Sequence, residues 1–223
     1  MTSIAIIDYG VGNLRSLEKA FAATGTKAVV SDDADVLREA KALVLPGVGA
    51  FGACMKALSE RGFERLVVER VAAGIPLLGV CVGMQLLFEE SEEFGRSPGL
   101  ALLRGKVRRF VGDLPVPHVG WNQVHQTRAH PLLAGIDNDS FFYFVHSYYC
   151  AVDEPNVVLG QTDYIKEYSS IVVQRHVAGV QFHPEKSQVN GLKLLSNFAQ
   201  LSDKSQLVAI PSPKGNYIVD SQT

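Results

Sequence analysis

Short, continuous apolar runs alternate with helical patterns along the first half of the chain. The runs cover residues 4–7, 28–30, 42–45 and 75–80, and helical spacing of apolar residues separates them over 14–25, over 50–73 with a break near Gly62, and over 83–90. Strands without polar alternation are buried on both faces, which is typical of parallel strands covered by helices. This half therefore predicts a doubly wound α/β sheet.

The second half consists mainly of strand patterns, over residues 106–110, 119–125, 140–152, 157–162 and 170–182. They predict an antiparallel extension that packs on the parallel sheet or continues it. Residues 190–201 predict a last amphipathic helix. Because there is no internal repeat or linker, we expect one domain over residues 1–201. Residues 202–223, rich in Ser, Pro, Lys and Asp, predict a disordered tail, with a docking segment or a cloning remnant as alternatives.

Composition excludes several classes of protein. The 223 residues are 47% hydrophobic and 20% charged with a formal net charge of -2, which is ordinary for a globular protein and favours no nucleic-acid partner. The first residues lack a signal-peptide pattern and no apolar run could span a bilayer, so we expect a cytoplasmic protein without membrane contact. Cys54, Cys81 and Cys150 form no CxxC pair, which argues against a zinc knuckle or a disulfide framework.

The clearest chemical motif is Gly79-Val80-Cys81-Val82-Gly83, where a strand runs into a cysteine and then into a helix. This is a nucleophile-elbow pattern with sulfur in place of a hydroxyl. The nucleophile sits in a strained turn, and side chains at the flanking glycine positions would collide with the neighbouring strand and helix. A sulfur at a helix N-terminus is favoured as thiolate, so Cys81 is the candidate nucleophile. A buried cysteine between two chance glycines is the alternative.

A thiolate nucleophile needs a proton shuttle and a group that orients the shuttle. The segment Gln181–Ser187 offers both in His183 and Glu185, which would project to the same side of an extended stretch. A carboxylate on one imidazole nitrogen fixes the tautomer and supports the imidazolium. A solvated loop with a chance His and Glu is the alternative for this pair.

Together, Gly-Val-Cys-Val-Gly-Met-Gln and Gln-Phe-His-Pro-Glu-Lys-Ser resemble the motifs of the class I (triad) glutamine amidotransferases, whose fold is flavodoxin-like. The resemblance implies that Cys81 attacks the carboxamide of glutamine, His183 protonates ammonia and Glu185 orients His183. The N–H of Val82 and the segment after the third strand would stabilise the oxyanion. The implied substrate-binding residues besides Val82 are Gly47, Val48, Gly49, Gln85, His146, Ser147 and Tyr148.

Further segments resemble one group within this family, the glutaminase subunits of imidazole glycerol phosphate synthase. They are Ile-Asp-Tyr-Gly-Val-Gly-Asn-Leu, Leu-Pro-Gly-Val-Gly-Ala-Phe-Gly, Pro117–Asn122 and Tyr143–Tyr148, so that the resemblance covers residues 3–201. It implies a TIM-barrel cyclase subunit as partner, which uses the ammonia in histidine biosynthesis. Candidates for the interface and gate are Asn13, Trp121, Tyr143 and Lys186. Neither a metal nor an organic cofactor is expected, since thiolate, imidazole and backbone N–H groups supply the chemistry.

Four alternatives compete with this interpretation. A dinucleotide-binding turn at Gly10-Val11-Gly12 would need its third glycine where Arg15 stands, and no phosphate-binding GxxxxGK[ST] loop exists. Related Cys-His folds act as γ-glutamyl hydrolases or peptidases without a partner. A non-catalytic scaffold would leave activity unchanged in Cys81→Ala. Other amidotransferase subunits, such as those for anthranilate or pyridoxal phosphate synthesis, share the triad, and only the less specific segments around Gly49 and Trp121 argue against them.

Overall fold

The computed structural model describes residues 4–203, and its centre is a parallel sheet. The strands run in the order β2 (Ala28–Ser31), β1 (Ile4–Ile7), β3 (Ala42–Gly47), β4 (Leu77–Cys81) and β13 (Val177–Val180), each parallel to its neighbours. Every residue of β1, β3, β4 and β13 is buried, as expected for strands covered on both faces. The doubly wound fold predicted from the sequence is confirmed, with the flavodoxin-like order 2-1-3-4.

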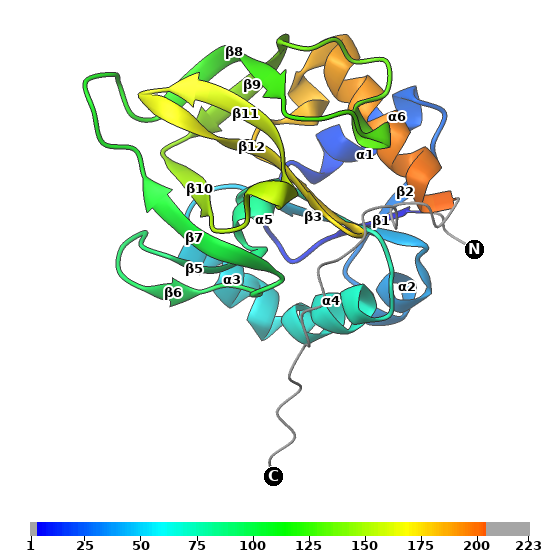
Figure 1. Ribbon diagram of the computed structural model, residues 1–223. Coiled ribbons are helices and arrows are strands. Elements are labelled where there is room, and N and C mark those ends of the chain that lie inside the picture. Colours follow the sequence, from blue (N-terminus) through cyan, green and yellow to red (C-terminus); the bar gives the residue numbers. More distant parts are fainter. Residues whose placement is uncertain (1–3, 204–223) are drawn as a thin grey trace.

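Helices cover both faces of this sheet (Figure 1). Helices α1 (Leu14–Ala23) and α6 (Gln188–Asp203) lie on one side, and α2 (Ala34–Glu39), α3 (Phe51–Glu60) and α4 (Phe63–Ala72) lie on the other. The predicted break at Gly62 separates α3 from α4, where this glycine adopts a left-handed φ of 71°. Helix α6 is longer than predicted, so Ser202 and Asp203 belong to it. The rest of the predicted tail, 204–223, lies outside the described residues.

The antiparallel extension continues the parallel sheet directly. From β13 it passes through β12 (Lys166–Gln174), β10 (Tyr148–Val152), β7 (Leu103–Arg109), β5 (Phe88–Ser91) and β6 (Ser97–Pro98). These neighbours pair antiparallel except for β7 and β5, which are parallel. A branch from β12 adds β11 (Val158–Tyr164), β8 (His118–Gln126) and β9 (Ser140–His146). Of the two arrangements that the sequence allows, the second half thus takes the continuous one.

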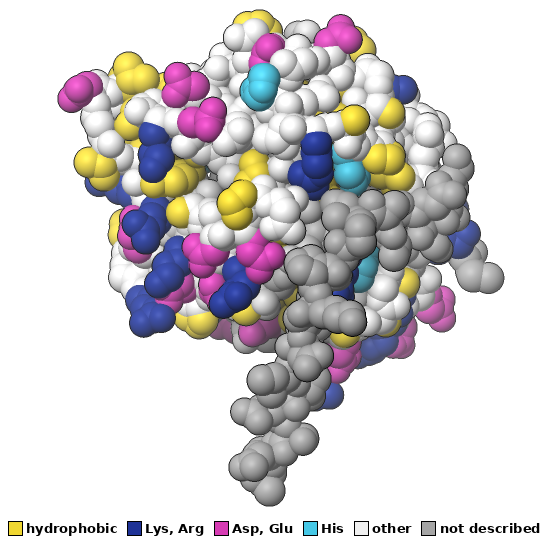
Figure 2. All heavy atoms as spheres, in the orientation of Figure 1, with side chains coloured by type: hydrophobic (Ala, Val, Ile, Leu, Met, Phe, Trp, Pro, Cys, Tyr) yellow, Lys and Arg dark blue, Asp and Glu magenta, His cyan; other side chains and the backbone are white. Residues whose placement is uncertain are grey.

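Acidic and basic side chains alternate on the surface over β5, β6 and β7 (Figure 2). There Glu90 pairs with Arg96 and with Lys106, whose Nζ lies 2.7 Å from Glu90 Oε1. Because the charges compensate one another locally, this surface is not the one-sided basic patch that binds nucleic acid.

The helix predicted over residues 83–90 is wrong. The helix after Cys81, α5 (Val82–Gln85), has a single turn, and Phe88 already begins strand β5, which pairs with β6 and β7. Leu86, Leu87 and Phe88 are all fully buried, and a short run that is apolar on every side does not distinguish a helix from a strand. Pairing with strands distant in sequence decided the outcome.

Candidate active site

Cys81 occupies the tight turn between β4 and α5. Its φ of 57° and ψ of −114° are a strained conformation for a residue with a side chain. The flanking glycines make this turn possible, because a Cβ on Gly79 would lie 2.6 Å from the carbonyl oxygen of Gly83, and a Cβ on Gly83 would overlap the carbonyl oxygen of Leu45. The geometry is that of a nucleophile elbow, and it places the sulfur at the carboxyl end of the sheet.

His183 and Glu185 follow the carboxyl end of β13 and contact each other. The Nδ1–H of His183 donates to Oε1 of Glu185 over 2.8 Å, and their side chains are 4% and 0% exposed. The sequence predicted an extended stretch here, which is wrong, since Pro184–Lys186 forms a 3-10 turn. The turn is tied down because the backbone N–H of His183 donates to the carbonyl of Tyr143 over 2.9 Å and Ser187 Oγ donates to the carbonyl of His183 over 2.6 Å.

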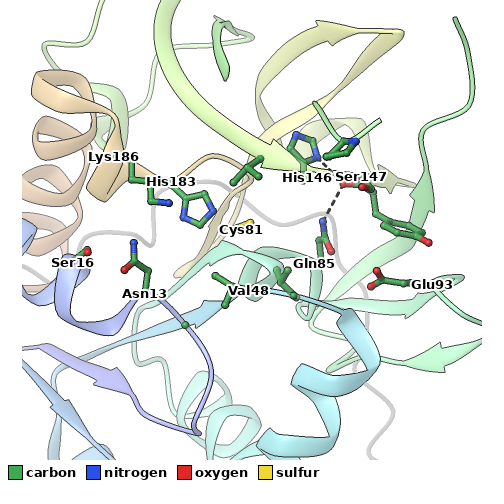
Figure 3. Close-up of a pocket in the computed structure, with 16 residues that line it drawn as sticks. Asn13, Ser16, Val48, Cys81, Gln85, Glu93, His146, Ser147, His183 and Lys186 are labelled. Carbon is green, nitrogen blue, oxygen red and sulfur yellow. Dashed lines mark hydrogen bonds between the residues drawn. The ribbon is translucent and has the colours of Figure 1, made fainter. Parts of the chain in front are cut away.

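The imidazole of His183 lies beside the sulfur of Cys81 in a shared pocket of about 680 Å³ (Figure 3). Burial lowers the pKa of His183, but hydrogen bonds and charges from Cys81 and Glu185 outweigh burial and raise this pKa to about 10. The ring is therefore an imidazolium at neutral pH whenever Cys81 is a thiolate. A thiolate–imidazolium pair with an orienting carboxylate is the arrangement that nucleophilic catalysis by cysteine requires.

Asn13 completes the surroundings of Glu185 from the other end of the chain. Its Nδ2 donates to Glu185 Oε1 over 3.0 Å, which is the oxygen that also accepts from His183. Asn13 stands at the start of α1, yet its side chain makes no capping hydrogen bond to that helix. The β1–α1 loop thus contacts the carboxylate that accepts from His183, a contact that the sequence interpretation of Asn13 as an interface residue did not include.

The glycine-rich segment after β3 lies against the elbow. Gly47 pairs with Cys81 across the parallel strands, and a Cβ on Gly47 would come within 2.6 Å of the backbone nitrogen of Gly83. Val48 and Gly49 line the pocket, and Gly49 has a φ of 83° that favours glycine. Val48, Gly49 and Val82 therefore border the same pocket as the sulfur of Cys81.

Most of the residues predicted for the site line this one pocket. They are Asn13, Val48, Gly49, Cys81, Val82, Gln85, His146, Ser147, Tyr148, His183 and Lys186. Of the remaining predicted residues, Gly47 and Glu185 lie behind the lining. Trp121 and Tyr143 lie on the adjacent β8–β9 hairpin, where their rings are 6.0 Å apart.

Comparisons with known proteins agree with this geometry. Residues 5–201 match the family described as glutamine amidotransferase class-I. The chain is 48% identical to the imidazole glycerol phosphate synthase subunit HisH of Nitrosomonas europaea, covering 89% of this chain and 98% of the relative. It is 48% identical to HisH of Sulfurimonas denitrificans, covering 88% and 97%.

The chain belongs to the HisH subunits of the class-I glutamine amidotransferase family. The fold is also that of solved amidotransferase structures. A crystal structure of a glutamine amidotransferase superposes with a TM-score of 0.72 at 23% identity, covering 89% of this chain and 98% of the other. The HisH relatives confirm the subgroup that the sequence suggested, and the family match identifies the chain as a glutamine amidotransferase enzyme.

Two of the residues of this glutamine amidotransferase site that sequence reasoning missed carry polar side chains close to the chemistry, Glu93 and Gln181. Glu93 lines the pocket on the side away from His183, and its Oε2 accepts from the backbone N–H of Phe51 over 2.6 Å (Figure 3). Gln181 is fully buried, with its Nε2 3.9 Å from Cys81 Sγ. Gln181 stands in the quoted His-Glu motif and could have been found there, whereas nothing local in the sequence connects Glu93 with the elbow.

The β8–β9 hairpin of this amidotransferase presents an apolar face next to the pocket. Val119 pairs with Val145, and Trp121 with Tyr143, so these side chains share one face. Val119, Trp121 and Val145 are 56%, 46% and 36% exposed, and Val145 also lines the pocket. The ammonium of Lys186 lies 5.7 Å from the ring centroid of Tyr143, which is a cation–π contact.

Within 4–203, no helix is long and apolar enough to cross a membrane. The same part of the chain contains no group of three or more His, Cys, Asp or Glu side chains arranged to hold a metal ion.

Proposed function

We propose that this chain hydrolyses glutamine through Cys81, His183 and Glu185 and passes the ammonia to a TIM-barrel cyclase subunit of imidazole glycerol phosphate synthase. The observation that carries the proposal is the placement of His183 beside the sulfur of Cys81 at the elbow (Figure 3), with a buried carboxylate on the other nitrogen of the imidazole. Membership of the HisH group supports the pathway.

In the first step, the thiolate of Cys81 attacks the carboxamide carbon of glutamine. The carbonyl oxygen becomes an oxyanion, for which backbone N–H groups of Val82 and of the Gly47–Gly49 segment are the donors. The imidazolium of His183 gives its Nε2 proton to the departing nitrogen, so ammonia leaves and a γ-glutamyl thioester remains. His183 then takes a proton from water, which attacks the thioester and releases glutamate with Cys81 restored.

The pocket also has the polarity that glutamine requires. Its α-ammonium group needs an anion, and the carboxylate of Glu93 lies at the end of the pocket opposite His183. Gln85 donates both hydrogens of its side-chain amide within the protein, to the Tyr148 carbonyl and to Gln181 Oε1, each over 3.1 Å. It can therefore offer a substrate only its oxygen, as an acceptor.

The apolar face of the β8–β9 hairpin supports a protein partner at the mouth of the pocket. Exposed apolar side chains that line up across two strands are costly in water and typical of an interface. Because Val145 belongs both to this face and to the pocket, a partner docked here would cover the exit for ammonia. Asn13, Trp121, Tyr143 and Lys186 are the proposed interface and gate residues. The proposed compartment is the cytoplasm, where a biosynthetic pair of this kind would work.

A covered exit also suggests that the rate of glutamine cleavage depends on the partner. Hydrolysis without a partner would release ammonia to water, so we propose that cleavage is slow until the cyclase and its nucleotide substrate are bound. The Gly47–Gly49 segment is the candidate switch between the slow and the active state. Gly47 packs on the elbow, and Gly49 adopts a left-handed backbone conformation that favours glycine.

The test is a glutaminase assay after co-purification with the cyclase. Glutamate release is measured for the chain alone, with the cyclase, and with the cyclase and its nucleotide substrate. Cys81→Ala should abolish release, whereas Cys150→Ala, at a buried cysteine of β10 outside the pocket, should retain it. Full activity of the chain alone would favour a free-standing hydrolase, and activity of Cys81→Ala would refute the proposed nucleophile.

A further inference from the structure

One buried polar side chain touches the sulfur and has no role in the mechanism above. Gln181 follows β13, is 0% exposed, and its Nε2 lies 3.9 Å from Cys81 Sγ, within the range of hydrogen bonds to sulfur. Its backbone N–H donates to the carbonyl of Ser170 over 2.9 Å, so the residue is fixed from the main chain as well. It approaches the sulfur from β13, the strand next to β4.

The hydrogen-bond network determines which end of the Gln181 amide faces the sulfur. The carbonyl oxygen of Tyr148 can only accept, so the group of Gln85 that lies 3.1 Å away must be its NH₂. The second hydrogen of that NH₂ reaches Oε1 of Gln181 over 3.1 Å. The oxygen of Gln181 is therefore occupied by Gln85, and its NH₂ is the end directed at Cys81.

A second tier of buried rings holds the Tyr148 carbonyl in place. The Nδ1–H of His146 donates to it over 2.8 Å, which leaves Nε2 of His146 as the acceptor for the hydroxyl of Tyr168 at 3.2 Å. Nδ1 of His118 lies 3.4 Å from the same hydroxyl. Burial lowers the pKa of His146 to about 3 and that of His118 to about 4, so both rings stay neutral and keep these roles at neutral pH.

The sulfur needs such a donor because its other sources of stabilisation are limited. Cys81 is 3% exposed, so water solvates a thiolate poorly, and the following helix has a single turn and therefore a weak dipole. Burial raises the pKa of the phenols and thiols around the sulfur, which keeps them neutral: Tyr9, Cys54, Cys150 and Tyr168. Next to the sulfur, His183 contributes a positive charge and Gln181 a neutral donor.

We propose that Gln181 is a further catalytic residue, whose Nε2–H donates to the thiolate of Cys81 and is aimed by the Gln85–Tyr148–His146–Tyr168 network. The inference rests on the proposed role of Cys81 as nucleophile. The donor stabilises negative charge on sulfur twice in a turnover, before the attack and again when the thioester breaks. It forms no covalent bond and transfers no proton.

The test is the rate at which iodoacetamide alkylates Cys81 as a function of pH, measured by mass spectrometry on the peptide that contains Cys81. Gln181→Met removes the donor at similar volume, and Gln181→Glu keeps an acceptor for Gln85 but replaces the donor. The matched control is Gln174→Met on β12, where the glutamine binds Glu154 outside the pocket. The full chain is used, with thermal unfolding as a check on folding.

We expect the pH midpoint of alkylation to rise by about one unit in Gln181→Met. A hydrogen bond to a charged group typically stabilises the charged form enough to shift a pKa by about one unit or more. Gln181→Glu should raise it further, and Gln174→Met should match the unmodified protein. A merely structural role would lower thermal stability and leave the midpoint unchanged. An unchanged midpoint in both Gln181 variants overturns the inference. Of the two variants, Gln181→Glu preserves the buried network best.

The two proposals fail in different ways. If Cys81→Ala retained glutaminase activity, the proposed nucleophile would be wrong and Gln181 would have no thiolate to serve. If Cys81→Ala were inactive while both Gln181 variants kept the alkylation midpoint of the unmodified protein, only the role of Gln181 would be rejected.

Discussion

The hydrogen bond from Asn13 to Glu185 leads to a quantitative prediction. The carboxylate of Glu185 is fully buried, its Oε1 accepts from both Asn13 and His183, and its Oε2 has no partner among the described residues. Asn13→Ala removes one of these two donors from an anion that water does not reach. Because the side chain of Asn13 does not cap α1, the change should cost that helix little stability.

The expected effect follows from the strength of such a bond. A hydrogen bond to a charged group contributes about 1.5–3 kcal/mol, and the lower end applies to a donor that is only half-buried. If most of this is lost where His183 must be held in place, kcat should fall by about tenfold. The KM for glutamine should change less than kcat, because Asn13 lines the pocket but its Nδ2 donates to Glu185. Asn13→Asp should be worse, because it places a second carboxylate beside Glu185.

The assay is steady-state glutaminase activity over a range of cyclase concentrations up to saturation, with saturating nucleotide substrate, accompanied by the affinity for the cyclase. The control is Asn156→Ala, an exposed asparagine in the 3-10 turn Pro155–Val157, which should behave like the unmodified protein. A normal kcat in Asn13→Ala would refute the positioning argument. A loss that disappears at higher cyclase concentration would assign Asn13 to the interface instead.

Three further predictions test other parts of the site. The pKa of His183 is raised to about 10, so its imidazolium persists above the usual range of histidine. We therefore expect kcat/KM to be level from roughly pH 7 to 9 and to fall as pH rises through the pKa of His183 in the folded protein. A fall centred near the ordinary pKa of histidine would contradict this. Gly83→Ala should destabilise the fold by at least ~2 kcal/mol, because its Cβ would overlap the Leu45 carbonyl oxygen, and an unchanged thermal midpoint would show that the elbow tolerates a side chain. Val119→Asp should weaken cyclase binding by about tenfold or more in a titration, whereas Val68→Asp on α4 should not, and equal affinities would argue against docking on the hairpin.

Local patterns in the sequence determined the parallel half of the fold and the two motifs of the proposed catalytic site. Strands such as β3 and β4 are apolar throughout because they are buried on both faces, and this property is visible in any short window. The elbow is equally local, since the glycines on both sides of Cys81 are required by contacts within the turn and with the adjacent strand. The Cys-His-Glu set could therefore be named before any coordinates.

Tertiary structure decided features that depend on residues far apart in the chain. Residues 86–91 became a buried turn and a strand instead of helix, because β7 and β6 supply pairing partners that no local window contains. The 3-10 turn at Pro184–Lys186 is set by hydrogen bonds to β9 and through Ser187, not by the segment's own extended preference.

The contacts around the proposed catalytic groups also depend on residues far apart in the chain. Asn13 reaches Glu185 across 172 positions, and Gln181 reaches Cys81 across 100. A side-chain hydrogen bond depends on a donor–acceptor distance within about 3–4 Å and on the direction of the donor. Neither can be read from a single sequence. Sequence thus named the proposed nucleophile, shuttle and orienting carboxylate, whereas packing of distant loops decided which groups contact them.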